Sequence, residues 1–240
     1  RVHSWSNFSR GCTIFMVGFC KKVLIADTVA PLADAAFAIK NPSMMDAWLG
    51  TIAYTIQLFF DFSGYTDMAI GLALMIGFVF PQNFNDPYTS KSITEFWQRW
   101  HMSLSSWLRE YLYIPLGGNK KGTRRTYINL FLTMLLGGLW HGANWTFVVW
   151  GAWHGGILAI ERYLKSKFGD SILPSWLRII KTMLLVMIGW IFFRAIDLNN
   201  ALQMLRGLIG LNGFNFSNMM EWQIEPDRLG ILFVAIFLVY

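Results

Sequence analysis

The stretch TYINLFLTMLLGGLWHGANWTFVVWGAWHGGILAI, residues 126–160, contains no Asp, Glu, Lys or Arg. A solvent-exposed loop or an ordinary amphipathic helix carries charges on its polar face, so this run is typical of a membrane protein. Basic residues precede it at 124–125 and follow it at Arg162, which predicts that both of its ends face the cytoplasm. Two full crossings need about 40 residues and a turn, so the run predicts a short re-entrant hairpin that turns near 137–142.

The composition of the whole chain agrees with this interpretation. Hydrophobic residues make up 55% of the 240 residues and charged residues only 14%, against about 25% charged in an average soluble domain. The mean hydropathy is +0.41. These values exclude a disordered chain, a nucleic-acid-binding module and a typical soluble enzyme. The net charge of +6 is expected to serve membrane topology and contact with lipid headgroups rather than binding of nucleic acid.

Two apolar stretches in the first third of the chain predict further membrane segments. Residues 11–39 are interrupted by Lys21 and Lys22, and charges at mid-bilayer are costly. This stretch therefore predicts two helices or half-helices with the lysines near a surface. Residues 47–80 carry only two charges and predict two short membrane segments with a helix break near 61–64.

The chain between 84 and 125 has a different texture. Apolar residues recur at three- and four-residue steps over 94–112, which predicts one amphipathic helix lying in the membrane interface. Ser92 followed by Glu95 matches a capping box at its start. Farther on, residues 176–193 predict another membrane segment and residues 198–208 a short amphipathic helix.

The domain organisation predicted from these segments is simple. The chain opens at Arg1 without Met and closes inside the apolar run 229–240, so we expect an internal piece of a longer protein. No repeat, low-complexity tract or soluble domain is visible. Residues 1–240 are therefore expected to form a single, partial membrane domain.

Titratable side chains inside apolar stretches are the candidate functional residues, because their burial is expensive. His141 stands out: it lies in the uncharged run between Gly138 and Gly142, and an imidazole exchanges protons near neutral pH. His101 lies on an apolar helix face and His154 between Trp150 and two glycines, and for both a packed core histidine is the more frequent interpretation. Asp61 could cap a helix or orient a histidine. The three histidines lack metal-ligand spacing, so no metal site is predicted. These patterns leave both a transporter and a membrane-embedded transferase open.

Three motifs resemble those of the membrane-bound O-acyltransferase family: DFSGYTDMA at 61–69, FWQRWHMSLS at 96–105 and GLWHG at 138–142. LREYLYIPLGGN at 108–119 is similar to the bacterial branch that contains the membrane subunit of alginate O-acetyltransferase. The motif core spans about residues 47–164. The resemblance implies an all-α, polytopic membrane helix bundle, with short tilted or re-entrant helices around a central tunnel. It implies a multi-pass protein of the bacterial cytoplasmic (inner) membrane.

The resemblance also implies an activity and its residues. The family's two site histidines map to His141, as general base, and His101, as a residue that lines or orients the site. The implied reaction moves an acyl group, expected to be acetyl, from a cytoplasmic thioester such as acetyl-CoA, with no bound cofactor. The acceptor would be a cell-surface polysaccharide such as alginate, reached through an extracytoplasmic acetyltransferase partner protein.

Further site residues are predicted around this pair. Residues expected to line the tunnel or contact substrate are Asp61, Trp140, Asn144 and His154. Residues expected to attract the phosphates of the donor electrostatically are Lys120, Lys121, Arg124 and Arg125. Alternatives that remain open are transfer of D-alanine to teichoic acid within the same family, a membrane transporter, and a scaffold subunit for a separate transferase.

Overall fold

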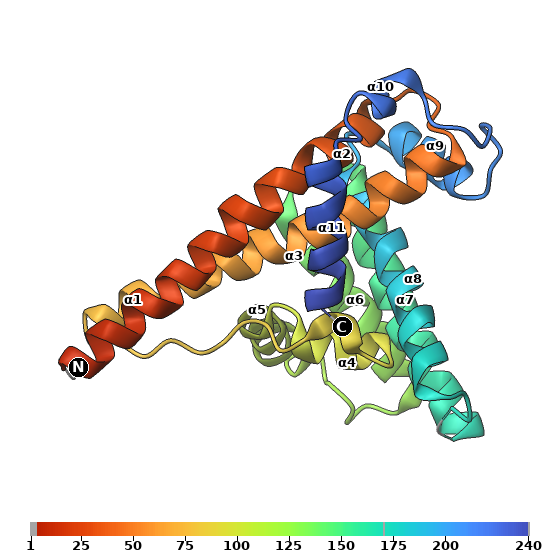
Figure 1. Ribbon diagram of the computed structural model, residues 1–240. Helices are drawn as coiled ribbons and strands as arrows, with labels where there is room; N and C mark the ends of the chain where they lie inside the picture. Colours follow the sequence, from red (N-terminus) through yellow and green to blue (C-terminus); the bar gives the residue numbers. More distant parts are fainter. Residues whose placement is uncertain (1–3, 170, 240) are drawn as a thin grey trace. The chain divides into compact units, whose positions relative to one another are not determined.

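The computed structural model describes residues 4–169 and 171–239. These residues form helices joined by turns and loops, and no β-strand occurs among them, which confirms the all-α prediction (Figure 1). Contacts within the chain divide it into two units. The first unit comprises residues up to 85 together with residues from 206 onward, and the second comprises residues 86–205. Helix α9 (Leu198–Leu208), the predicted amphipathic piece, straddles the boundary.

The first unit is built on two long helical runs. Its elements are α1 (Trp5–Cys20), the π-helical turn η1 (Lys21–Ala26), α2 (Asp27–Ala38), α3 (Met44–Met75), α10 (Asn218–Glu221) and α11 (Pro226–Leu238). Helices α1 and α2 pack along α3, and α11 contacts α2 and α3 (Figure 1). Asp46, wholly buried near the start of α3, accepts the backbone N–H groups of Ser43 and Ser217 and so ties the late residues of the chain to this unit.

The prediction of two helices or half-helices over 11–39 is confirmed in that α1 and α2 are separate α-helices, but η1 joins them without an interruption. Residues 5–38 form one continuous helical run in which η1 carries the change of hydrogen bonding. The lysines do not need to leave the helix, because each finds an acidic partner on α3. The ammonium of Lys21 lies 2.7 Å from Asp67, and that of Lys22 lies 2.6 Å from Asp61 and 2.7 Å from Asp27.

The predicted helix break near 61–64 is wrong, since α3 runs through it for 32 residues. Gly64 allows α1 and α3 to approach each other closely. A Cβ atom at Gly64 would lie 2.7 Å from the carbonyl oxygen of Gly18 in α1, and one at Gly71 would lie 2.6 Å from that of Gly11. Glycine at these crossing points lets the backbones of α1 and α3 touch.

The second unit contains the uncharged run. Its elements are η2 (Pro87–Thr89), α4 (Ile93–Arg99), α5 (Met102–Leu108), the π-helical turn η3 (Arg109–Tyr113), α6 (Thr123–His141), α7 (Trp145–Phe168), α8 (Ser175–Arg194) and most of α9. Helix α8 matches the segment predicted at 176–193. Among the described residues it is the one helix whose length and apolar composition would allow it to cross a bilayer.

The predicted hairpin is present, but its turn lies later than expected. Helix α6 continues through 137–141, and the chain reverses at 142–144. Gly138 is helical and serves helix packing instead. It is buried against α7, and an added Cβ would lie 2.3 Å from the carbonyl oxygen of Phe147. Gly151 of α7 approaches α6 as closely, with a would-be Cβ 2.5 Å from the carbonyl oxygen of Met134.

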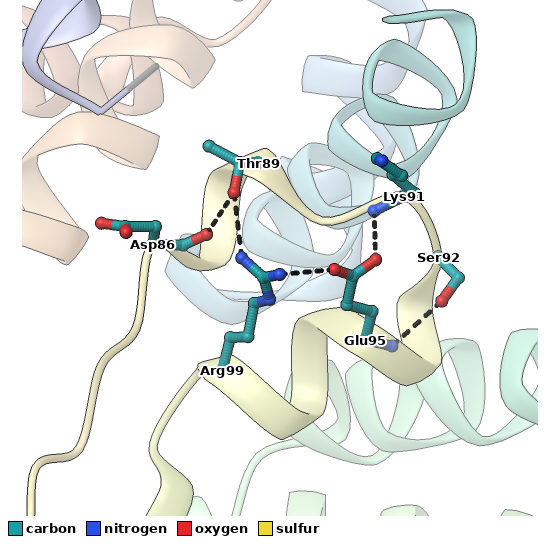
Figure 2. A network of polar contacts seen from close by, with 6 residues as sticks. All are labelled: Asp86, Thr89, Lys91, Ser92, Glu95 and Arg99. Carbon is teal, nitrogen blue, oxygen red and sulfur yellow. Dashed lines mark hydrogen bonds and ion pairs between the residues drawn. The ribbon is translucent and has the colours of Figure 1, made fainter. Parts of the chain in front are cut away.

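The single amphipathic helix predicted over 94–112 is broken into α4 and α5 at Trp100 and His101. The start of α4 is confirmed, because the Ser92 hydroxyl accepts the backbone N–H of Glu95 at 3.0 Å. The reciprocal bond of a capping box is replaced. The Glu95 carboxylate instead accepts the backbone N–H of Lys91 at 2.8 Å and pairs with Arg99 at 2.7 Å (Figure 2).

Candidate active site

His141 is the last residue of α6, and its imidazole lies among aromatic rings from three helices. Ring centroids of Trp140 and Trp150 lie 5.1 Å away, that of Phe193 lies 5.2 Å away and that of Phe147 lies 6.3 Å away. The imidazole is half-buried. These rings cover part of the imidazole, and the rest of the side chain is exposed.

The close packing of α6 and α7 sets this geometry. Gly142 follows His141 directly, and a Cβ there would lie 2.7 Å from the Phe147 ring. Asn144 then caps α7 by accepting the backbone N–H of Thr146 at 3.1 Å. Its amide also donates to the carbonyl oxygen of Ile196 at 2.8 Å, which ties the hairpin turn to the chain that follows α8.

His101 occupies the N-cap position of α5 in a left-handed backbone conformation, with φ 43° and ψ 57°. A non-glycine residue in this region costs about 1–2 kcal/mol and often marks a functional site. The Ser103 hydroxyl lies 3.5 Å from its Nδ1. Burial lowers the pKa of His101 to about 4, with a smaller contribution from the nearby His141. Because this pKa lies well below 7, the imidazole is neutral near pH 7.

The fold thus brings together two histidines that lie forty positions apart in the sequence. Both residues lie in the second unit, and His141 contributes to the lowered pKa of His101. The strained backbone of His101 gave no sequence signal, because the apolar periodicity of 94–112 runs on through it. The pairing itself was predicted only through the family motifs.

His154 is wholly buried on α7 and is enclosed by three tryptophans. Its ring centroid lies 5.2 Å from those of Trp97 and Trp150 and 6.2 Å from that of Trp190. A Cβ added at Gly189 of α8 would lie 2.5 Å from its Nε2 atom, so this glycine makes room for the ring. Trp150 contacts both His141 and His154 and links them through one indole.

Sequence reasoning missed the aromatic core around these histidines. Trp97 of α4 and Trp190 of α8 were not predicted as site residues, yet both pack on Trp150, with ring centroids 5.6 Å and 6.4 Å away. Tyr88 extends the same core by stacking on Trp100 at 5.9 Å. Each of these residues is abundant in membrane interfaces, so its type alone could not reveal that it is buried in the protein.

The remaining predicted site residues lie in three different places in the structure. Trp140 is largely exposed apart from its contact with His141. Asp61 belongs to the first unit and pairs with Lys22. The basic residues expected to attract the donor are exposed in the turn before α6 and in its first turn, at Lys120, Lys121, Arg124 and Arg125. No group of three or more potential metal ligands occurs in the part of the chain that the structure describes.

Chemically, the arrangement around His141 suits proton transfer. A neutral imidazole can accept a proton from a hydroxyl within hydrogen-bond reach. The aromatic wall lowers the local dielectric, which strengthens electrostatic interactions in the site. His101 supplies a second neutral imidazole that can orient a polar group.

Comparison with known proteins gives a consistent result. The model of the membrane-bound O-acyltransferase family matches residues 1–204. The chain is 56% identical over 235 residues to the probable alginate O-acetylase AlgI of Azotobacter vinelandii. The aligned region covers 98% of this chain and 47% of that protein. The chain is 44% identical over 222 residues to the peptidoglycan O-acetyltransferase of Helicobacter pylori, which covers 91% of this chain and 42% of the relative.

A more distant relative is the teichoic acid D-alanyltransferase of Streptococcus thermophilus, 38% identical over 165 residues, which covers 63% of this chain and 40% of that protein. The chain spans about half the length of the curated relatives it matches.

Proposed function

Because this chain belongs to the membrane-bound O-acyltransferase family, we propose that it is the motif-bearing part of a membrane-embedded O-acetyltransferase with His141 as general base. The single observation that carries the proposal is the setting of His141: a half-buried imidazole at a helix end, walled by aromatic rings and followed by glycine. The same motif histidine is the one that the resemblance assigns to the family's site.

The proposed reaction is acyl transfer to a hydroxyl. The imidazole of His141 accepts the hydroxyl proton as the oxygen attacks the thioester carbonyl carbon. The tetrahedral intermediate then expels a thiolate, which takes the proton back from the imidazolium, so the base is regenerated and an ester and a thiol leave. General-base assistance of this kind contributes about 10²- to 10⁴-fold. His101 orients the acceptor or the thioester by a hydrogen bond.

Acetyl is favoured over D-alanyl by the comparisons. Two O-acetyl-transferring relatives match more than nine-tenths of the chain, whereas the D-alanyltransferase matches a smaller part at lower identity. By analogy with the alginate relative, the proposed acceptor is a cell-surface polysaccharide such as alginate. The proposed partner is an extracytoplasmic acetyltransferase, which the family resemblance implies. The proposed location is the bacterial inner membrane, with several passes and a central tunnel formed in the full-length protein.

The proposed donor is acetyl-CoA or another acyl thioester. Four exposed cations lie within six residues at the start of α6, where they can attract phosphate groups. Replacing all four with Gln should raise the KM for the donor and leave kcat unchanged, with the difference shrinking at high salt. An unchanged KM would remove the loop from the donor site.

The function is tested by His141→Ala and His141→Gln in the full-length protein, expressed in cells that make the polysaccharide. Ester-bound acetate released by mild alkali should fall by at least 10²-fold in both variants at equal membrane protein level. Ser166→Ala, an exposed change on α7, serves as the expression control. Acetylation that persists within twofold in both variants would favour a scaffold subunit, and transport of substrate without any acyl product would favour a transporter.

A further inference from the structure

A basic cleft lies within the second unit, at the end of α7 and the beginning of α8. Its volume is about 730 Å³, which is within the usual range for ligand sites. Its positive side chains are Lys91, Arg162, Lys165, Arg178 and Lys181. None of these residues belongs to the histidine site or to the loop before α6, so the function proposed above leaves this cleft unexplained.

The acidic residues of the basic cleft are already engaged within the fold. Glu161 accepts the backbone N–H groups of Ile93 and Thr94 at 2.9 and 3.1 Å, together with the Thr94 hydroxyl at 3.2 Å. Glu95 pairs with Arg99 and accepts a backbone N–H at the edge of the cleft (Figure 2). The cleft is lined by five positive and two negative side chains, and this formal excess of positive charge suits an anion.

Several exposed apolar side chains also line the cleft. Ile172 is 100% exposed and Phe168 is 70% exposed, and both line the cleft together with Leu164 and Leu173. Exposed apolar groups beside several cations would be unfavourable in water alone. They match the boundary of a bilayer, where cations meet headgroup phosphates and apolar side chains enter the acyl region.

The position of the cleft along the chain points to the same boundary. Helix α8 is apolar and long enough to cross a bilayer, and it begins at Ser175, two residues after Leu173. Arg178 and Lys181 lie three residues apart and so occupy one face of its first turns. Basic residues at the cytoplasmic end of a spanning helix interact with anionic lipid headgroups.

We propose that the basic cleft binds the headgroup phosphate of an anionic phospholipid, with Arg178 and Lys181 as its principal contacts and with Phe168 and Ile172 among the acyl chains. A soluble phosphate ester such as coenzyme A offers the same anionic chemistry. It offers no acyl chains for the exposed apolar side chains, and for this reason the lipid is the better match.

The test uses full-length protein in neutral detergent micelles, with thermal unfolding as the readout. A ligand that binds only the folded state raises the unfolding temperature, by an amount that grows with the logarithm of its concentration relative to its Kd. Phosphatidylglycerol, phosphatidylcholine, coenzyme A and inorganic phosphate are titrated separately. We expect phosphatidylglycerol to raise the unfolding temperature of the wild-type protein in a way that depends on the cleft residues. We expect no such dependence on the cleft residues for the other three compounds.

The variant Arg178→Gln/Lys181→Gln should need about 30-fold more phosphatidylglycerol for the same shift, from roughly 1 kcal/mol for each basic residue near an anionic surface. Lys120→Gln/Lys121→Gln removes the same charge outside the cleft and should change the requirement by less than twofold. Should the first variant fail to fold, Lys181→Glu replaces it, because Lys181 is exposed and its loss leaves the core intact.

Three results would overturn the proposal: equal stabilisation by phosphatidylcholine, equal loss in the two double variants, or stabilisation by coenzyme A or phosphate that depends on the cleft residues while phosphatidylglycerol has no effect.

Discussion

Replacing Gly138 with Ala tests whether the close contact of α6 and α7 sets the position of His141. The added Cβ would lie 2.3 Å from the carbonyl oxygen of Phe147 and 3.0 Å from the Cα atom of Gly151. Ordinary contact begins near 3.4 Å, so the two helices must move apart by about 1 Å. Neither obstacle is a flexible side-chain end, and the displacement therefore acts on the backbone that carries the site.

The consequences for stability and for activity differ in size. Overpacking of this kind costs about 1–3 kcal/mol, while Ala is favoured over Gly in a helix by about 1 kcal/mol. The net loss of unfolding free energy is therefore about 0–2 kcal/mol. His141 follows three residues later and contacts Phe147 and Trp150 on the displaced helix. A misplacement of about 1 Å lowers a catalytic rate by about 10²-fold.

The assay compares Gly138→Ala with Gly137→Ala in the full-length protein, measuring ester-bound acetate and thermal unfolding in detergent. Gly137 is a matched control because its added Cβ would meet only the two Leu108 methyl carbons, at 3.4 and 3.8 Å. Gly137→Ala should keep wild-type activity. Equal activity of the two variants would refute the reasoning that the helix contact positions the histidine.

Two further predictions concern stability alone, measured by thermal unfolding of the full-length protein. Glu161→Ala leaves two backbone N–H groups at the start of α4 without their acceptor and should lower the unfolding free energy by about 1–3 kcal/mol. The control Glu110→Ala, at an exposed position, should have little effect. Equal losses in the two variants would contradict the role of Glu161 in capping α4. Gly18→Ala places a Cβ 2.5 Å from the carbonyl oxygen of Gly64 and should destabilise the first unit by about 1–3 kcal/mol. By contrast, Gly230→Ala, which meets nothing within 4 Å, should be neutral or stabilising.

Features that depend on local composition were predictable from the sequence. The uncharged run gave the α6–α7 hairpin, and the apolar stretch 176–193 gave α8. Family motifs predict His101 and His141 as site residues, and both residues lie in the second unit. Each of these signals lies within a short stretch of chain, so no knowledge of a distant partner was needed.

Features that depend on a distant partner were not predictable. Lys21 and Lys22 suggested a helix boundary because an unpaired charge inside an apolar helix is costly. Their carboxylate partners lie in α3, about forty residues later, and pairing removes that cost. Gly64 similarly suggested a break, although its role is set by Gly18 on another helix. In both cases the sequence showed a residue that needs special surroundings, but it did not show the partner on another helix that provides them.

Exposure distinguishes His154 from His141 within the second unit. A hydroxyl can give up its proton only to an imidazole that it can reach. His154 is wholly buried among three tryptophans, so its ring serves first to complete the packing that also contacts Trp150. His141 shares Trp150 as a wall but ends its helix beside a glycine and stays half-buried. This difference supports His141 rather than His154 as the proposed general base, and Trp150 contacts both rings.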